Sequence, residues 1–169
     1  MRPFQLHRPG TLDEVLTLLE EHGPDETHVL AGGTSLVLLM NLGLVQPGHV
    51  VSLREVAELH GTQRLPDGGI VLRAMATHRQ LEQSVDVAAF CPALTETFGH
   101  VATVRIRNQA TVGGNVVHAD PAQDPPAMLV ALDAEAVIRS RAGQRIIPLE
   151  SLFVGYLTTS LTDGEVLTE

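Results

Sequence analysis

A glycine pair, Gly32 and Gly33, separates an apolar segment at residues 27–31 from a helical pattern at 34–42, and a further apolar segment follows at 49–53. The order strand, glycine turn, helix, strand is typical of a βαβ unit. Strands joined through a helix lie parallel, and the crossover is right-handed. Because a helix beginning near Thr11 precedes this unit, the first 54 residues predict a small parallel α/β subdomain.

The pattern changes after Arg54. Segments 61–65 and 69–75 flank a Pro-Asp-Gly turn, and segments 135–140 and 144–148 flank an Ala-Gly turn, so each pair predicts a hairpin. Helical patterns lie between them, at the capping box of Thr77 and Gln80, at 92–102 and at 124–132, and short strands are expected at 152–156 and 165–168. We therefore expect an α+β fold, with a parallel subdomain at 1–54 and a larger subdomain with an antiparallel sheet at 55–169.

The charge balance restricts the partners. Asp and Glu number 20 against 11 Arg and no Lys, which gives a net charge of -9. Such a chain repels nucleic acid and anionic membranes, so neither is expected as a partner. Its longest apolar run, residues 36–45, is shorter than the roughly 20 residues of a membrane span. No signal-peptide pattern is present, which predicts a cytoplasmic protein, and the single Cys91 excludes a disulfide or a four-thiolate metal site held by this chain alone.

Two glycine motifs are candidate binding sites. Glycine lets a ligand approach the backbone, and N–H groups at the start of a helix attract an anion such as a pyrophosphate. Hydroxyl side chains in both motifs, and an amide side chain in the second, add hydrogen-bonding groups. The alternatives are a tight turn that starts a helix for the first motif, and a bulge or turn with solvent-facing arginines (Arg105 and Arg107) for the second. The first glycine motif is Ala31, Gly32, Gly33, Thr34 and Ser35, and the second is Thr111, Val112, Gly113, Gly114 and Asn115.

Two acidic residues follow the second glycine motif. Asp120 and Asp124 are candidates to accept hydrogen bonds from sugar hydroxyls. Asp124 is also a candidate helix N-cap, because two prolines follow it. A metal or acid–base pair is disfavoured, since no further ligand is grouped with them. The eight histidines show no metal-binding spacing, and no nucleophile motif is present, so we predict neither a metal site nor a catalytic residue.

Together these motifs resemble the FAD-binding, medium subunit of the carbon monoxide dehydrogenase and xanthine dehydrogenase family of molybdenum hydroxylases. The resemblance covers essentially the whole chain, and the long second motif is its most specific part. Its segments are residues 31–41, 106–115, 118–121 with Asp124, 153–156 and 164–167. Members of this family continue into a third, C-terminal subdomain, which is absent here, so the chain is expected to be truncated.

The resemblance implies the FAD-binding fold shared with vanillyl-alcohol oxidase. FAD would lie between the two subdomains, with its pyrophosphate held by Gly32–Ser35 and Thr111–Asn115. Asp124 would bind the ribityl chain, and Val101 would contact the cofactor. The subunit would be inactive alone. A molybdopterin large subunit would reduce the [2Fe–2S] clusters of a small partner, and the FAD subunit would take electrons from these clusters and pass them to quinone, NAD or oxygen. The alternatives are a stand-alone FAD oxidoreductase of the same fold and a non-catalytic truncated remnant.

Overall fold

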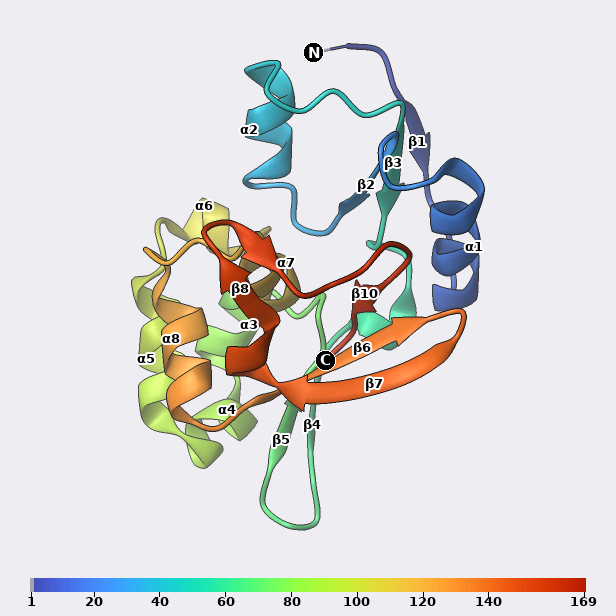
Figure 1. Ribbon diagram of the computed structural model, residues 1–169. Helices are drawn as coiled ribbons and strands as arrows, with labels where there is room; N and C mark the ends of the chain where they lie inside the picture. Colours follow the sequence, from blue (N-terminus) through green and yellow to red (C-terminus); the bar gives the residue numbers. More distant parts are fainter. Residues whose placement is uncertain (1) are drawn as a thin grey trace.

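The N-terminal part of the chain is a three-stranded parallel sheet. A computed structural model describes residues 2–169 (Figure 1). Strands β1 (Gln5–His7), β2 (Thr27–Leu30) and β3 (His49–Ser52) lie in the order β1-β3-β2. Helix α2 (Leu36–Asn41) connects β2 to β3, and these two strands pair in parallel. The predicted order of strand, glycine turn, helix and parallel strand is confirmed, while β1 was not expected.

Helix α1 (Leu12–His22) packs on this sheet because one of its faces is apolar. The Thr11 hydroxyl accepts the N–H of Glu14 at 3.3 Å, which satisfies a donor at the helix start. The Glu14 carboxylate instead accepts the N–H of Gly10, one residue before the cap. Leu12, Val15 and Leu16 are buried against Val51 of β3 and their neighbours. The helix ends at Gly23, whose φ is 70°.

The rest of the chain combines antiparallel strands with short helices. The hairpins β4 (Thr62–Arg64) with β5 (Ile70–Leu72) and β6 (Glu135–Ser140) with β7 (Gly143–Pro148) are confirmed. Strand β10 (Val166–Leu167) pairs antiparallel with β6, which makes a second three-stranded sheet. The remaining strands and short 3₁₀ turns are β8 (Phe153–Gly155), β9 (Thr158–Thr159), η1 (Ala57–Leu59) and η2 (Leu149–Leu152).

Six helices gather on one side of the antiparallel strands (Figure 1). Two expectations need correction here. The second glycine motif is not the bulge or turn that was its alternative, because Val112 to Asn115 form the first turn of helix α7. Asp124 is the first residue of α8 and not its N-cap, which is Gln123. The six helices are α3 (His78–Gln83), α4 (Val85–Phe90), α5 (Pro92–His100), α6 (Val104–Arg107), α7 (Val112–His118) and α8 (Asp124–Ala131).

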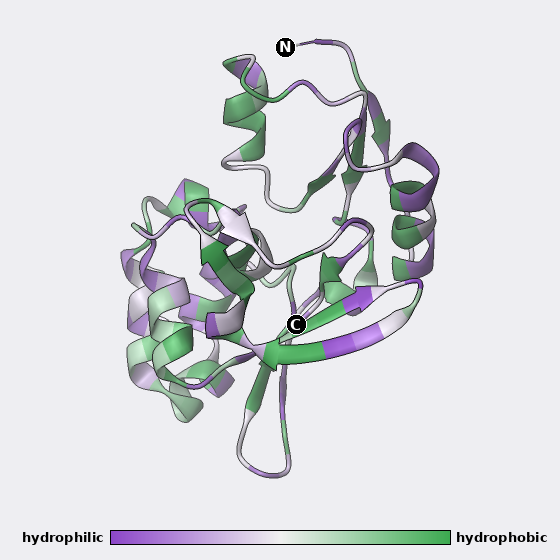
Figure 2. Ribbon diagram, viewed as in Figure 1, coloured by the Kyte–Doolittle hydropathy of each residue, from purple (hydrophilic) through white to green (hydrophobic). Residues whose placement is uncertain are grey.

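Two buried clusters hold the fold together. The larger one lies between the short helices and the β6–β7 hairpin, with Phe98 and Leu152 fully buried. The smaller one lies between α1 and the parallel sheet, but it also includes Met75 and Val166 from the part of the chain that follows Arg54. Helix α2 is largely hydrophobic (Figure 2), and its Leu38 is 57% exposed. None of the helices within residues 2–169 combines the length and the apolar character needed to cross a bilayer.

Candidate functional site

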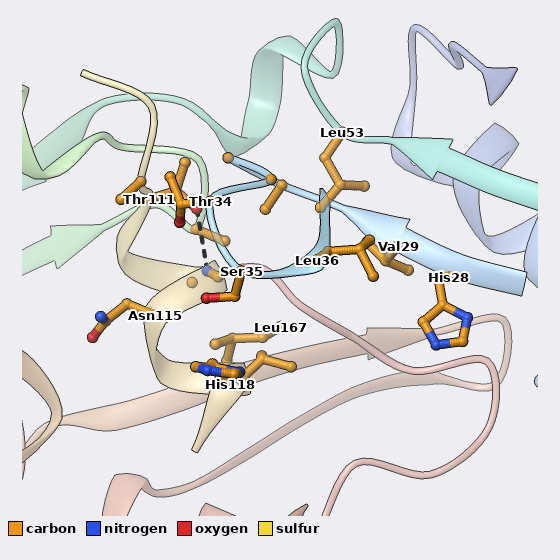
Figure 3. Close-up of a pocket in the computed structure, with 18 of the residues that line it drawn as sticks. His28, Val29, Thr34, Ser35, Leu36, Leu53, Thr111, Asn115, His118 and Leu167 are labelled. Atoms are coloured by element: carbon orange, nitrogen blue, oxygen red, sulfur yellow. Dashed lines mark hydrogen bonds between the residues drawn. The ribbon is translucent and has the colours of Figure 1, made fainter. Parts of the chain in front are cut away.

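A pocket of about 520 Å³ lies where both glycine motifs meet strand β10 (Figure 3). This volume falls within the range of about 300–1,000 Å³ that small-molecule sites occupy. One wall comes from the end of β2, the first glycine motif and α2, and the other from α7. The segment at 157–167 closes a third side. Of the twelve predicted site residues, the structure places nine on the lining: Ala31, Gly32, Gly33, Thr34, Ser35, Thr111, Gly113, Gly114 and Asn115.

The two glycine motifs approach each other at backbone distance. A Cβ atom on Gly32 would lie 2.0 Å from the carbonyl oxygen of Gln109, just before the second motif. A Cβ atom on Gly114 would lie 3.2 Å from the Cβ of Ala31. Gly33 has a φ of 75°, which glycine adopts readily and other residues rarely do. Glycine is therefore required at 32 by a close approach and at 33 by the backbone conformation.

The first glycine motif carries free donors. Within the described chain, the N–H groups of Gly32, Gly33, Thr34 and Ser35 donate to no protein acceptor. Two of its carbonyls are used, because Gly33 accepts from Val37 and Ser35 accepts from Leu39 at the start of α2. Four consecutive free N–H groups along a pocket wall suit an oxyanion ligand.

The second glycine motif is bonded internally. The N–H of Val112 donates to the Ala76 carbonyl, and the N–H of Gly113 donates to the Ala74 carbonyl. The N–H of Gly114 donates to the Thr111 hydroxyl at 3.2 Å. The N–H of Asn115 donates to the Thr111 carbonyl. This motif therefore shapes the wall with its glycines, and Asn115 offers its side-chain amide in place of its backbone.

Several buried polar atoms of the lining lack a protein partner. They are Nδ1 of His28, Oδ1 of Asn115 and Oε1 of Gln123. A buried polar atom without a hydrogen bond costs about 1–3 kcal/mol, so such atoms are normally paired. Three of them on one pocket indicate a site built for a polar ligand.

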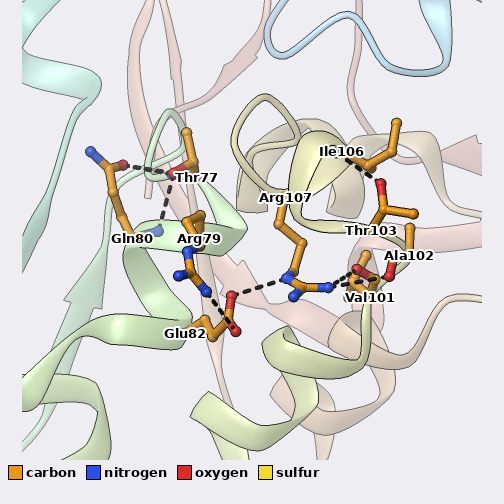
Figure 4. A network of polar contacts seen from close by, with 9 residues as sticks. All are labelled: Thr77, Arg79, Gln80, Glu82, Val101, Ala102, Thr103, Ile106 and Arg107. Atoms are coloured by element: carbon orange, nitrogen blue, oxygen red, sulfur yellow. Dashed lines mark hydrogen bonds and ion pairs between the residues drawn. The ribbon is translucent and has the colours of Figure 1, made fainter.

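No Arg or Lys appears among the residues that line the pocket. Arg107, which the sequence offered as a source of positive charge, is buried and bonded elsewhere (Figure 4). Its guanidinium donates to the Glu82 carboxylate at 2.9 Å and to the carbonyls of Val101 and Ala102. Hydrogen bonds from Arg79 and Arg107 lower the pKa of Glu82. The charge of an anionic ligand would thus be met by backbone N–H groups.

One ionised carboxylate stands on the rim. Glu165 lines the pocket and pairs with Arg145 through both carboxylate oxygens, at 2.6 and 2.7 Å. The hydrogen bonds from Arg145 lower the pKa of Glu165 to about 2. This pair also bonds the Ser160 carbonyl, so it fixes the loop between β9 and β10 against β7.

Three predicted site residues lie away from the lining. Val112 is buried and turned toward the larger cluster, Asp124 is exposed at the start of α8, and Val101 ends α5. Conversely, His28 and Gln123 line the pocket although nothing in their sequence pattern singled them out, and residues 165–167, which belong to a segment that carries the resemblance, line it without having been assigned to the site. His118, which begins the segment 118–121 of the resemblance, also lines it.

Residues 2–169 match a protein family described as "FAD binding domain in molybdopterin dehydrogenase". The chain belongs to this family. It is 34% identical to the carbon monoxide dehydrogenase medium chain of Hydrogenophaga pseudoflava over 98% of its own length. It is also 34% identical, over its full length, to the caffeine dehydrogenase subunit beta of Pseudomonas sp. (strain CBB1). A solved carbon monoxide dehydrogenase from Hydrogenophaga pseudoflava superposes on 99% of the chain with a TM-score of 0.94.

The family description confirms FAD as the cofactor that the resemblance predicted. The mixed helix and sheet architecture is likewise that of the matched structure. The chain spans 57% of the length of the medium chain and 58% of the caffeine dehydrogenase subunit. The pocket fits the cofactor chemically, because it offers free backbone donors for a pyrophosphate, a glycine-lined wall that a side chain would fill, and unpaired buried polar atoms.

Proposed function

We propose that the chain is the FAD-binding part of the electron-transfer subunit of a molybdenum hydroxylase. The observation that carries this proposal is the row of four free N–H groups in the first glycine motif, on a pocket whose opposite wall is the second glycine motif. Bound FAD would supply the redox chemistry, and the chain's own residues would hold and orient it. The fold relation to vanillyl-alcohol oxidase and the two subdomains that meet at Arg54 are part of the same proposal.

The two motifs would divide the work of holding the pyrophosphate. The N–H groups of residues 32–35, together with the hydroxyls of Thr34 and Ser35, would donate to phosphate oxygens. Hydrogen bonds to a charged group are worth about 1.5–3 kcal/mol each, which is enough to hold an anion without an arginine. The second motif would contribute the amide of Asn115 and the close approach that Gly113 and Gly114 permit.

The other assigned residues have more distant roles in this proposal. Asp124 would bind the ribityl chain from the exposed start of α8, a position that adjoins Gln123 on the lining. Val101 would contact the cofactor beside the turn that Arg107 holds through the carbonyls of Val101 and Ala102. No residue of this chain is proposed to be catalytic, because electron transfer requires no acid or base from the subunit.

The partners follow from the family. Iron–sulfur and molybdopterin subunits would deliver electrons through [2Fe–2S] clusters, and quinone, NAD or oxygen would accept them. The relatives named above are a medium chain and a subunit beta of dehydrogenases, which supports a role within a multi-subunit enzyme. A cytoplasmic location stays a prediction from the sequence.

The test measures how much flavin is retained by a variant in which one pocket side chain keeps its shape but gains a negative charge. The chain is loaded with FAD and desalted, and its visible absorption spectrum is recorded. Asn115→Asp keeps the shape of the side chain but sets a negative charge against the pyrophosphate. We expect FAD affinity to fall at least about 10-fold, which corresponds to about 1.4 kcal/mol. Asn41→Asp, at the exposed end of α2, is the matched control and should retain FAD as the wild type does.

The outcomes separate the possible functions. Retained FAD with co-purification of iron–sulfur and molybdopterin subunits supports the electron-transfer subunit. Retained FAD with oxidoreductase turnover by the chain alone would instead favour a stand-alone enzyme. A chain that is folded by circular dichroism and binds no FAD would identify a remnant. Equal affinity in the two Asp variants would contradict the assignment of the pocket.

A further inference from the structure

Three histidines from separate elements converge outside the pocket. His7 ends β1, His22 ends α1 and His49 begins β3, and each is half-buried. One ring nitrogen from each lies within 4.8 Å of the other two. Nε2 of His7 is 3.0 Å from Nδ1 of His49, and the rings of His22 and His49 stack with centroids 3.7 Å apart. None of the three lines the pocket between the glycine motifs.

The fold explains why they meet. Strands β1 and β3 pair in parallel, with Gln5 opposite His49 and His7 opposite Val51. Side chains two residues apart point to the same face, so His7, His49 and Val51 share one face of the sheet. Helix α1 covers that face, as its contacts with Val51 show, and Figure 1 shows it beside β1 and β3. The last turn of α1 therefore places His22 over the two strand histidines.

This arrangement offers ligands of one chemical type. Imidazole nitrogen is the commonest protein ligand of zinc-like ions, and three histidines with one open position form a complete ligand set for Zn²⁺. A tetrahedral ion with Zn–N bonds of about 2.0–2.1 Å holds its ligand nitrogens about 3.3 Å apart. The 3.0 Å separation of His7 and His49 is close to this spacing. A nitrogen of His22 lies within 4.8 Å of both, and its half-buried ring, stacked on His49, would have to turn to reach the same spacing.

The surroundings favour a cation. The last turn of α1 presents the negative end of the helix dipole, and the whole chain carries a net charge of -9.

We propose that His7, His22 and His49 bind a divalent transition-metal ion of the Zn²⁺ type, with water in the fourth position. The ion would link β1, α1 and β3, and would stabilise the N-terminal sheet on the side away from the pocket. This inference stands on the histidine geometry and is independent of the proposed function.

The test uses the untagged full chain, stripped with a chelator and then titrated with Zn²⁺ and Co²⁺. We expect one equivalent of Zn²⁺ to bind, the thermal unfolding midpoint to rise, and Co²⁺ to give the visible bands of a tetrahedral site. His22→Asn should weaken Zn²⁺ binding by more than about 100-fold, because losing even an outer-shell partner costs about 10–100-fold. His22 ends its helix, so the substitution spares the sheet, and circular dichroism checks the fold.

The matched control is His100→Asn, at the end of α5, whose side chain is 71% exposed and outside the cluster. This variant should bind Zn²⁺ as the wild type does. The proposal is overturned if Zn²⁺ does not bind stoichiometrically, or if folded His22→Asn and His100→Asn bind it equally well. FAD content should be unchanged by Zn²⁺ removal, and a parallel loss of FAD would contradict the separation of the two sites.

Discussion

Replacing Gly32 with alanine should separate the two glycine motifs. The added Cβ would lie 2.0 Å from the carbonyl oxygen of Gln109 and 2.7 Å from its carbon. Both neighbours are backbone atoms, so no side chain can rotate away. Because contacts under 3.0 Å are essentially never seen for a Cβ, the two segments must move apart by about 1 Å.

The effect on stability and on binding can be estimated separately. Overpacking of this kind costs about 1–3 kcal/mol, and in a chain of this size each kcal/mol lowers the unfolding midpoint by about 2–4 °C. The same movement increases the distance between the free N–H groups of the first glycine motif and the second glycine motif, so both motifs can no longer contact the same phosphate group. Losing one hydrogen bond to a charged phosphate costs about 1.5–3 kcal/mol, so FAD affinity should fall by about 10- to 150-fold.

The assay is a flavin titration followed by thermal unfolding. Unfolding is recorded by circular dichroism, because the chain has no Trp whose fluorescence could report it. Gly10→Ala is the matched control, because its Cβ would meet only the Glu14 carboxylate, at 3.9 Å. Gly32→Ala should lose both affinity and stability, while Gly10→Ala should keep both. If Gly32→Ala binds FAD as tightly as Gly10→Ala does, the contact between the motifs is not part of the binding site.

Three further predictions concern stability. Burial lowers the pKa of His78 from 6.5 to about 4, so acidification favours the unfolded state, in which this histidine takes up a proton more readily. Between about pH 7 and pH 5 the free energy of unfolding of the wild type, measured in urea, should fall by about 2 kcal/mol more than that of His78→Leu. The pKa of Glu165 is lowered from 4.5 to about 2, so its pairing with Arg145 should stabilise the fold above pH 4.5 and fade toward pH 2; a Glu165→Gln variant with the wild-type acid profile would contradict this. Arg107→Met should cost about 2 kcal/mol by leaving the Val101 and Ala102 carbonyls unpaired, whereas the exposed Arg105→Met should change the unfolding midpoint little.

The elements that the sequence predicts well depend on short-range patterns. Both hairpins follow from a glycine-containing turn between two strand-like segments, and the start of α1 follows from the side chain of Thr11. The parallel pairing of β2 with β3 follows from the helix between them. The first glycine motif was expected to precede a helix, and it does, because α2 begins directly after Ser35.

Contacts between distant residues explain what the sequence left out. Gly113 and Gly114 have poor helix propensity, yet they are helical because the Gly113 N–H is bonded to Ala74 and the Thr111 hydroxyl caps the turn. Strand β10 forms one side of the pocket through its pairing with β6, which no local pattern shows. His7 and His49 are 42 positions apart, so only the strand register reveals that they meet.

The small buried cluster under α1 has a consequence for synthesis. Met75 and Val166 complete that cluster, and residues 165–167 also line the pocket. Ribosomes deliver the chain from its N-terminus, so the parallel sheet emerges long before its last packing partner. Val15, Leu16 and Val51 therefore stay incompletely buried until residue 166 has been synthesised and can pack against them. The nucleotide pocket thus cannot be complete before residues 165–167 have been made, and any flavin that binds there must be captured after translation has passed β10.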